Sequence, residues 1–135
     1  MERRILQLFL FFNICILTSC SSQININEFI DKNEPLELKI NKIDSLTGFT
    51  STEQLKIPAN SDKFIQLTQW ADNNTTGWKS TPASYIAGVY VGQGNFRLLY
   101  TPGTAGVIIG FIDKNDKSRQ YSKDIKKGEL DFLAE

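Results

Sequence analysis

The chain has 135 residues, with 15 basic and 15 acidic side chains, two cysteines and no histidine. Balanced charge argues against nucleic-acid binding, which needs a basic face. Zinc, copper and haem sites usually draw on His or Cys, and Ser-His and Cys-His nucleophiles need histidine, so we expect no metal, no other cofactor and no such hydrolase.

The chain opens with Arg3 and Arg4, followed by an apolar run from Ile5 to Leu17 that only two polar residues interrupt. This layout is typical of a signal peptide. A membrane-spanning helix needs about 20 apolar residues, and this run is shorter. We therefore expect a cleaved signal and not a membrane span.

The run ends on Leu17, Thr18, Ser19 and Cys20. This ending resembles the lipobox of bacterial lipoproteins. The resemblance implies a signal peptide over residues 1–19 and a lipid attached to Cys20, the first residue of the mature chain. Two other readings stay open: a secreted protein with a stray cysteine, or two thiols, Cys15 and Cys20, buried in an N-terminal helix.

In the lipoproteins of Gram-negative bacteria, the residue after the cysteine sorts the protein between membranes. Ser21, in place of an aspartate, implies attachment to the outer membrane on its periplasmic side. Cleavage would leave 116 residues, enough for one domain. With Cys20 acylated, no disulfide could form, so stability would rest on the core.

Residues 20–34 are predicted to be a tether between the lipid and a domain that begins at residue 35. The tether would be unusually apolar, so we expect part of it to pack on the domain or on a partner. Its apolar side chains are Ile24, Ile26, Phe29 and Ile30.

Alternating apolar and charged residues predict a first strand over 36–40, and a Ser-Leu-Thr-Gly turn at 45–48 leads to a second strand over 54–57. The period then changes to that of an amphipathic helix over 61–74, with Ser61 as its N-cap. The apolar stripe of this helix is Phe64, Leu67, Trp70 and Ala71.

Beyond Pro82 the pattern predicts strands, turns and a final helical turn. The expected strands are 84–91 and 95–101, joined by a loop at 92–95, then a central strand over 104–113 and a polar edge strand over 118–125. We expect Gly106 and Gly110 to let the helix approach closely. The tail should pack Leu130, Phe132 and Leu133 inward. The sum is an α+β domain over 35–135, an antiparallel β-meander with one main amphipathic helix packed on a face.

Several motifs have a chemical and a structural reading. The glycine loop at 92–96 links two strands and lacks the helix N-terminus that would hold a phosphate. The segment 113–118 opens like a calcium loop but lacks its glycine and its final glutamate. Two carboxylate pairs could serve acid–base chemistry, yet turn and tail positions favour solvated surface: Asp113 with Asp116, and Glu129 with Asp131.

The aromatic residues between the helix and the next strand are the candidates for partner binding. Trp70 belongs to the apolar stripe of the helix and is expected in the core. Trp78 follows the helix break, and its position leaves core and contact surface equally open. Trp78 and Tyr85 are the predicted partner-binding residues, since large aromatics dominate interface energetics.

The last 75 or so residues resemble small uncharacterised bacterial envelope proteins. The likeness lies in the step from Asn74 to Trp78, in TPASY at 81–85 and in VGQGNFRL at 91–98. It implies no catalytic motif. We expect a lipid-anchored envelope lipoprotein with a non-catalytic protein-binding domain, such as an inhibitor or immunity protein against an effector acting in the periplasm. An assembly accessory of an envelope complex and a carboxylate-dependent hydrolase remain as alternatives.

Overall fold

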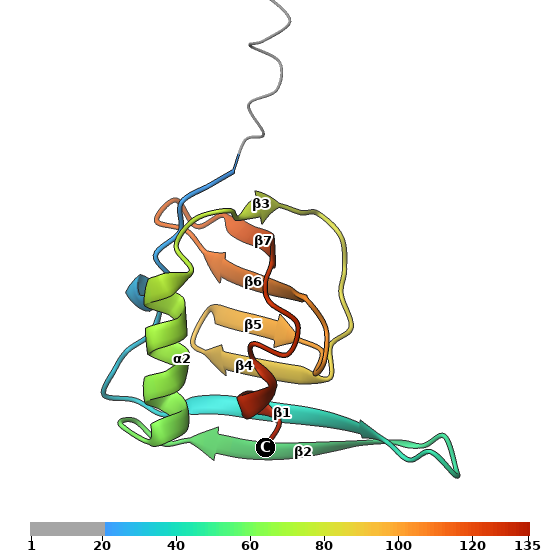
Figure 1. The fold of residues 1–135 in the computed structure, drawn as a ribbon. Coiled ribbons are helices and arrows are strands. Elements are labelled where there is room, and N and C mark those ends of the chain that lie inside the picture. Colours follow the sequence, from blue (N-terminus) through green and yellow to red (C-terminus); the bar gives the residue numbers. More distant parts are fainter. Residues whose placement is uncertain (1–20) are drawn as a thin grey trace, which may run out of the picture.

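The structure is a computed structural model that describes residues 21–135, so the expectations for the signal peptide and for Cys20 concern residues outside this range. Within it, seven strands form one antiparallel sheet in the order β2-β1-β4-β5-β6-β7-β3, with the helix α2 on one face (Figure 1). The predicted α+β class, with a meander and one main helix, is confirmed.

Short helices stand at both ends of the fold, and α2 separates the first two strands from the other five. In chain order the elements are the 3-10 helix Ile26–Phe29, β1 (Leu36–Ile43), β2 (Thr50–Ile57), α2 (Asp62–Asn73), β3 (Lys79–Ser80), β4 (Val89–Gln93), β5 (Phe96–Tyr100), β6 (Gly106–Ile112), β7 (Ser118–Asp124) and the 3-10 helix Asp131–Leu133.

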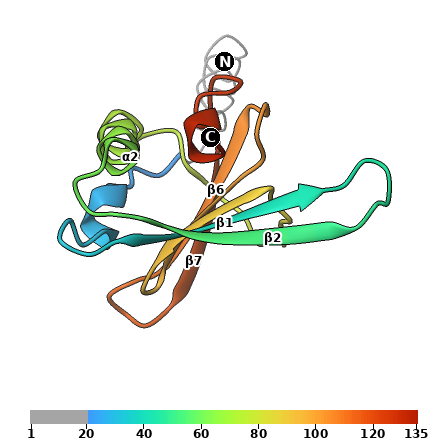
Figure 2. The ribbon, with the colours of Figure 1, turned by 90° about the horizontal axis from the view of Figure 1, so that it is seen from below.

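The core lies between α2 and one face of the sheet. Register places four apolar side chains in a row across four neighbouring strands, namely Leu38, Val91, Leu98 and Ile109. The predicted apolar stripe of α2 covers this face, and all four of its members are buried. The helix and the C-terminal tail lie on the same side of the sheet (Figure 2).

The helix begins and ends where the sequence predicts. The hydroxyl of Ser61 accepts a hydrogen bond from the backbone N–H of Phe64 at 3.3 Å, and Asp62 places its charge at the positive helix end. At the other end the side chain of Asn74 donates to the carbonyl of Trp70 at 3.0 Å. These caps explain why the helix stops before the polar run that follows.

The N-terminal segment is part of the domain. Ile24, Ile26 and Ile30 are buried, and the amide of Ser22 donates to the carbonyl of Trp78 at 2.7 Å. Part of the tether predicted over 20–34 packs on the domain, as its apolar residues led us to expect, and these residues complete the core. The folded domain thus already includes Ser22, before the boundary predicted at residue 35.

The hairpin of β4 and β5 is tighter than predicted. Gln93 pairs with Phe96, so the connection is the two residues Gly94 and Asn95, and Gly94 has the positive φ of 55° that such a turn requires. The strand also begins at Val89 and not at residue 84. Ile86, in the preceding segment, is 99% exposed and has no face of the sheet to pack against.

The role predicted for the glycines of β6 is wrong. Gly110 lies on the opposite face from the helix, where a Cβ atom would come within 2.5 Å of Nε of Arg97. The core face of β6 is instead formed by Val107, Ile109 and Phe111. The predicted tail is confirmed, since Leu130 and Leu133 are fully buried and Phe132 packs against the core.

Candidate binding surface

Trp78 is a core residue. Its side chain is completely buried, its indole N–H donates to the carbonyl of Asn74 at 2.7 Å, and its ring meets that of Trp70 edge to face at a centroid distance of 6.5 Å. The ammonium of Lys123 lies 5.9 Å from the ring centroid. Of the two readings left open for Trp78, the core reading holds, and the ring offers no surface to a partner.

Tyr85 lies apart from this site, in the irregular segment 81–88. It is 41% exposed, and its hydroxyl shares a 2.7 Å hydrogen bond with that of Thr81. The structure thus does not join Trp78 and Tyr85 into one contact surface, because one is enclosed and the other faces solvent.

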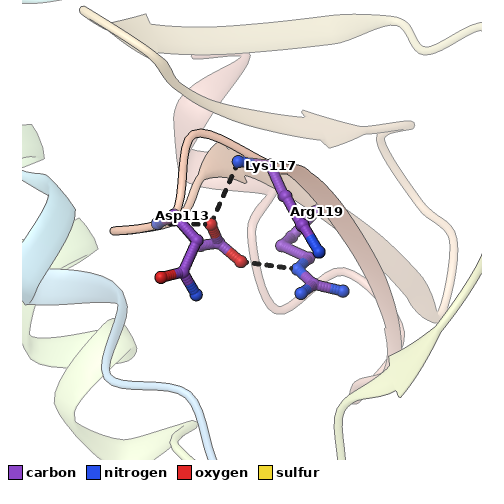
Figure 3. Close-up of polar contacts among 4 residues, drawn as sticks. Asp113, Lys117 and Arg119 are labelled. Atoms are coloured by element: carbon purple, nitrogen blue, oxygen red, sulfur yellow. Dashed lines mark hydrogen bonds and ion pairs between the residues drawn. The ribbon is translucent and has the colours of Figure 1, made fainter.

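The turn between β6 and β7 is closed by Asp113 (Figure 3). One carboxylate oxygen accepts the backbone N–H groups of Asn115 and Lys117 at 2.9 and 3.0 Å, and the other accepts Nε of Arg119 at 2.7 Å. The Arg119 hydrogen bond, together with the amide of Lys117, lowers the pKa of Asp113 to about 2. Both oxygens are committed to the turn, which supports the structural reading of this calcium-like segment.

The tail is fastened to the core by two carboxylates. Asp131 accepts the hydroxyl of Tyr100 at 2.6 Å and the amide of Gly103 at 2.8 Å, and Glu129 accepts the indole N–H of Trp70 at 2.9 Å. Burial, and then the carboxylate of Asp131, raises the pKa of Tyr100 to about 12. The Tyr100 hydroxyl and the Gly103 amide lower the pKa of Asp131. These acids hold the tail in place.

The open hollows on the sheet surface include two of about 450 and 510 Å³. The first is lined by Glu34 and Glu37 together with Lys56 and Tyr90. The second lies between Arg97 and the segment 80–84. The first hollow is lined by two exposed carboxylates, those of Glu34 and Glu37. These are the two residues whose substitution tests the hydrolase alternative.

The most conspicuous surface feature is the far end of the β1–β2 hairpin. β4 pairs only with Glu37–Ile40 of β1, so residues 42–51 extend beyond the sheet as an arm (Figure 2). At the turn, one carboxylate oxygen of Asp44 accepts the amides of Leu46 and Thr47 at 2.9 and 2.8 Å, and Gly48 has a φ of 70°. The arm thus has a defined turn.

The end of this arm is apolar. Ile43 is 73% exposed, Leu46 95% and Phe49 77%, and we call these three side chains the arm tip. Ile43 and Phe49 lie on opposite faces of the hairpin, because Phe49 pairs with Asp44, the neighbour of Ile43. Single exposed apolar residues are ordinary, but three within seven residues at the end of a projecting element mark an interaction site. The arm tip is therefore the leading candidate for a contact surface.

The arm also carries the free edge of the sheet. The backbone amide of Asn41 donates to the carbonyl of Gly88, on the side of β4, and that of Asp44 donates to the carbonyl of Phe49, on the side of β2. Because backbone groups alternate in direction along a strand, odd-numbered residues of β1 bond toward β4 and even-numbered ones toward β2. With the observed register, the backbone groups of alternate residues of β2 point away from β1, namely those of Thr50, Thr52, Gln54 and Lys56. An edge of this length can accept an added strand.

The sequence interpretation missed this surface. It expected a short turn between two short strands and did not weigh three large apolar residues placed in and beside a polar turn. The position of these residues was the available signal, because a turn that only joins two core strands does not need large apolar side chains.

In residues 21–135, no helix is long and apolar enough to span a membrane.

No protein-family model, curated protein or solved structure matches this chain. The geometry of the domain itself is therefore what bears on function.

Proposed function

We propose that the protein is an envelope lipoprotein, attached through Cys20 to the periplasmic side of the outer membrane, whose domain binds a protein partner through the arm and does not catalyse a reaction. The arm tip carries this proposal, with three large apolar side chains exposed at the end of a projection. The lipobox resemblance supports the anchor.

The arm lies at the other edge of the sheet from the point where the chain enters the fold. Ser22, two residues after Cys20, pairs with Trp78 next to β3, whereas β2 is the last strand at the opposite edge. Six interstrand spacings of ~4.8 Å separate β3 from β2, roughly 29 Å. An anchor at Cys20 would hold the β3 edge at the membrane and present the arm away from it. A protein, and not the anchoring lipid, is therefore the partner that the arm would meet.

The energetics favour a partner with an apolar cleft. Burying each large apolar side chain contributes roughly 1.5–3 kcal/mol, which for three residues is comparable to the lower end of the ~4–15 kcal/mol cost of association. The arm tip alone would bind weakly. Main-chain bonds along β2 would supply further affinity, as in strand-addition complexes. Insertion of such an arm into the cleft of a toxic effector suits the inhibitor or immunity version of the proposal.

Crosslinking from the arm tests this function. A photo-crosslinking residue at position 46 of the full-length protein should yield one discrete adduct, identified by mass spectrometry, whereas the same residue at exposed Ile86 should not. The purified partner should then lose affinity for Leu46→Ser/Phe49→Ser. Binding that is unaffected by this double change would refute the proposed surface.

The free edge is tested separately. The amide of Gln54 points away from β1, so Gln54→Pro would remove an edge donor without breaking a β1–β2 hydrogen bond. Strand addition predicts that Gln54→Pro weakens binding and that Gln54→Ala does not. Equal affinities would limit the interface to the arm tip.

An assembly role is the second candidate, because the same arm could join a resident envelope complex. The identity of the crosslinked protein distinguishes the two, since an effector-like partner supports inhibition and a resident envelope protein supports assembly. For the hydrolase alternative, Glu34→Gln/Glu37→Gln should abolish a hydrolytic activity on wall or lipid substrates.

A further inference from the structure

The edge of the domain where the chain enters carries a group of lysines. We call Lys79, Lys123, Lys126 and Lys127 the lysine cluster. Lys79 lies on β3 opposite Ser122 of β7, and Lys123 is the next residue of β7, so the two lysines flank this edge of the sheet on its opposite faces. Lys126 and Lys127 follow the end of β7 and are exposed.

The entry point of the chain lies beside this cluster. The amide of Ser22 bonds to the carbonyl of Trp78, the residue before Lys79. The ammonium of Lys123 lies 5.9 Å from the Trp78 ring and donates to the carbonyl of Thr76. The amide of Lys126 donates to Glu129, which binds the indole of Trp70. These contacts connect the lysine cluster to the strand that carries Ser22.

The cluster is a local excess of positive charge. Its acidic neighbours include Asp124, whose carboxylate lies 3.9 Å from the ammonium of Lys79, and Glu129, which accepts the amide of Lys126 and the indole of Trp70. The carboxylate of Asp131 lies beside Gly128, the residue after Lys127. Four lysines thus stand beside three carboxylates, whereas residues 20–135 together carry 13 basic and 14 acidic side chains. The chain concentrates positive charge at the edge where it enters the fold.

We propose that the lysine cluster binds the anionic phospholipid headgroups of the membrane that holds Cys20. This rests on the lipid anchor of the proposed function. Two residues, each spanning at most ~3.6 Å, separate Cys20 from Ser22, so the entry edge lies within roughly 7 Å of the acylated residue. That distance is shorter than the Debye length of about 8 Å at physiological salt. Lysines so placed interact with the negative surface potential, and they orient the domain with its arm away from the bilayer.

Amine labelling of the full-length acylated protein in vesicles tests this orientation. The vesicles contain either phosphatidylcholine alone or phosphatidylcholine with phosphatidylglycerol, and acetylation of each lysine is followed by mass spectrometry. We expect Lys79, Lys126 and Lys127 to label on the order of threefold more slowly in the anionic vesicles, and high salt to remove the difference. Lys32 and Lys56, exposed and outside the cluster, should label equally in both. If every lysine were acetylated at the same rate in the anionic vesicles as in the neutral ones, the inference would be overturned.

A charge-reversal pair sharpens the test. Lys126→Glu/Lys127→Glu should abolish the lipid-dependent protection of Lys79, whereas Lys32→Glu/Lys56→Glu, with the same change in charge, should preserve it. Protection that survives in the first variant would overturn the proposed contact.

Flotation with the vesicles separates this inference from the anchor. Wild-type protein that floats but labels equally in both lipids refutes the lysine contact and leaves the anchor intact. Wild-type protein that does not float, like Cys20→Ala, refutes the anchor and with it the membrane contact. The arm interface is judged by its own crosslinks in either case.

Discussion

Replacing Trp78 by alanine decides between the two roles that its position in the sequence allowed. The side chain is fully buried, so the substitution empties a cavity in the core. Truncation of a buried tryptophan typically costs about 3–5 kcal/mol. The free energy of unfolding of a small domain is only about 5–15 kcal/mol, so the variant should lose a large share of its stability.

Trp78→Phe should cost less, because it keeps most of the apolar volume and loses the 2.7 Å hydrogen bond to Asn74. A buried carbonyl left without its donor costs about 1–3 kcal/mol. The measurement is urea unfolding of residues 21–135, followed by far-ultraviolet circular dichroism because the substitution changes the tryptophan fluorescence. Tyr85→Ala is the control and should change stability by no more than about 0.5 kcal/mol.

The opposite result would refute this reasoning. If Trp78→Ala unfolded at the same urea concentration as wild type and yet lost its partner, Trp78 would be a contact residue and its enclosed position would be wrong.

Three further predictions follow from the fold. Starting the chain at Asp31 should destabilise it by several kcal/mol in urea unfolding, since each isoleucine lost from the core contributes about 1.5–3 kcal/mol, whereas loss of a tether would have no effect. Folding raises the pKa of Tyr100 from 10.0 to about 12, so its stabilising contribution is complete below pH 10 and is lost as the pH rises toward 12. In urea unfolding measured against pH, Tyr100→Phe should therefore lose less of its free energy of unfolding between pH 10 and 12 than wild type does. Folding lowers the pKa of Asp131 below 3.8, so its stabilising contribution is present above that pH and is lost as the pH falls through the lowered value. Asp131→Asn should reduce the loss of stability in acid, measured by urea unfolding against pH. An unchanged loss of stability in acid would contradict the Tyr100–Asp131 hydrogen bond.

The elements with strong local signals were predictable from the sequence. Ser61 and the stripe from Phe64 to Ala71 specify a capped helix by themselves, and both are observed. The segments that form β5 and β6 carry enough apolar residues to predict the buried strands of a meander. Their ends were less predictable, because Gln93 extends its strand through pairing with Phe96, which no single segment reveals.

The position of the N-terminal segment depends on tertiary contacts. Its isoleucines indicated packing, but Ser22 joins the fold only because Trp78, far along the chain, supplies both partners of an antiparallel bridge. The same contact explains why Trp78 could not be assigned from its neighbours. A tryptophan between a glycine and a lysine has no periodic pattern that would place it in a core.

The apolar residues at the turn were a signal in the sequence, but the projection of the arm could not be predicted, because it depends on where a neighbouring strand ends. β1 continues as far as Ile43, yet β4 pairs only as far as Ile40. Ile43 also falls on the face of β1 that carries Glu37 and Lys39, because side chains alternate along a strand and the buried face is that of Leu38 and Ile40. The exposure of Ile43 therefore follows from the alternation, whereas the length of the arm follows from where β4 ends.

The most direct test of the proposed function compares two sets of exposed apolar residues in binding to the crosslinked partner. Leu46→Ser/Phe49→Ser alters the arm tip, and Ile86→Ser alters a residue that is 99% exposed elsewhere. Both variants should keep wild-type stability to within about 0.5 kcal/mol, because the altered side chains are exposed. We expect the arm-tip variant to bind at least about tenfold more weakly, equivalent to ~1.4 kcal/mol, and Ile86→Ser to bind like wild type. Equal affinities for wild type and the arm-tip variant would contradict the proposal that the arm is the binding surface.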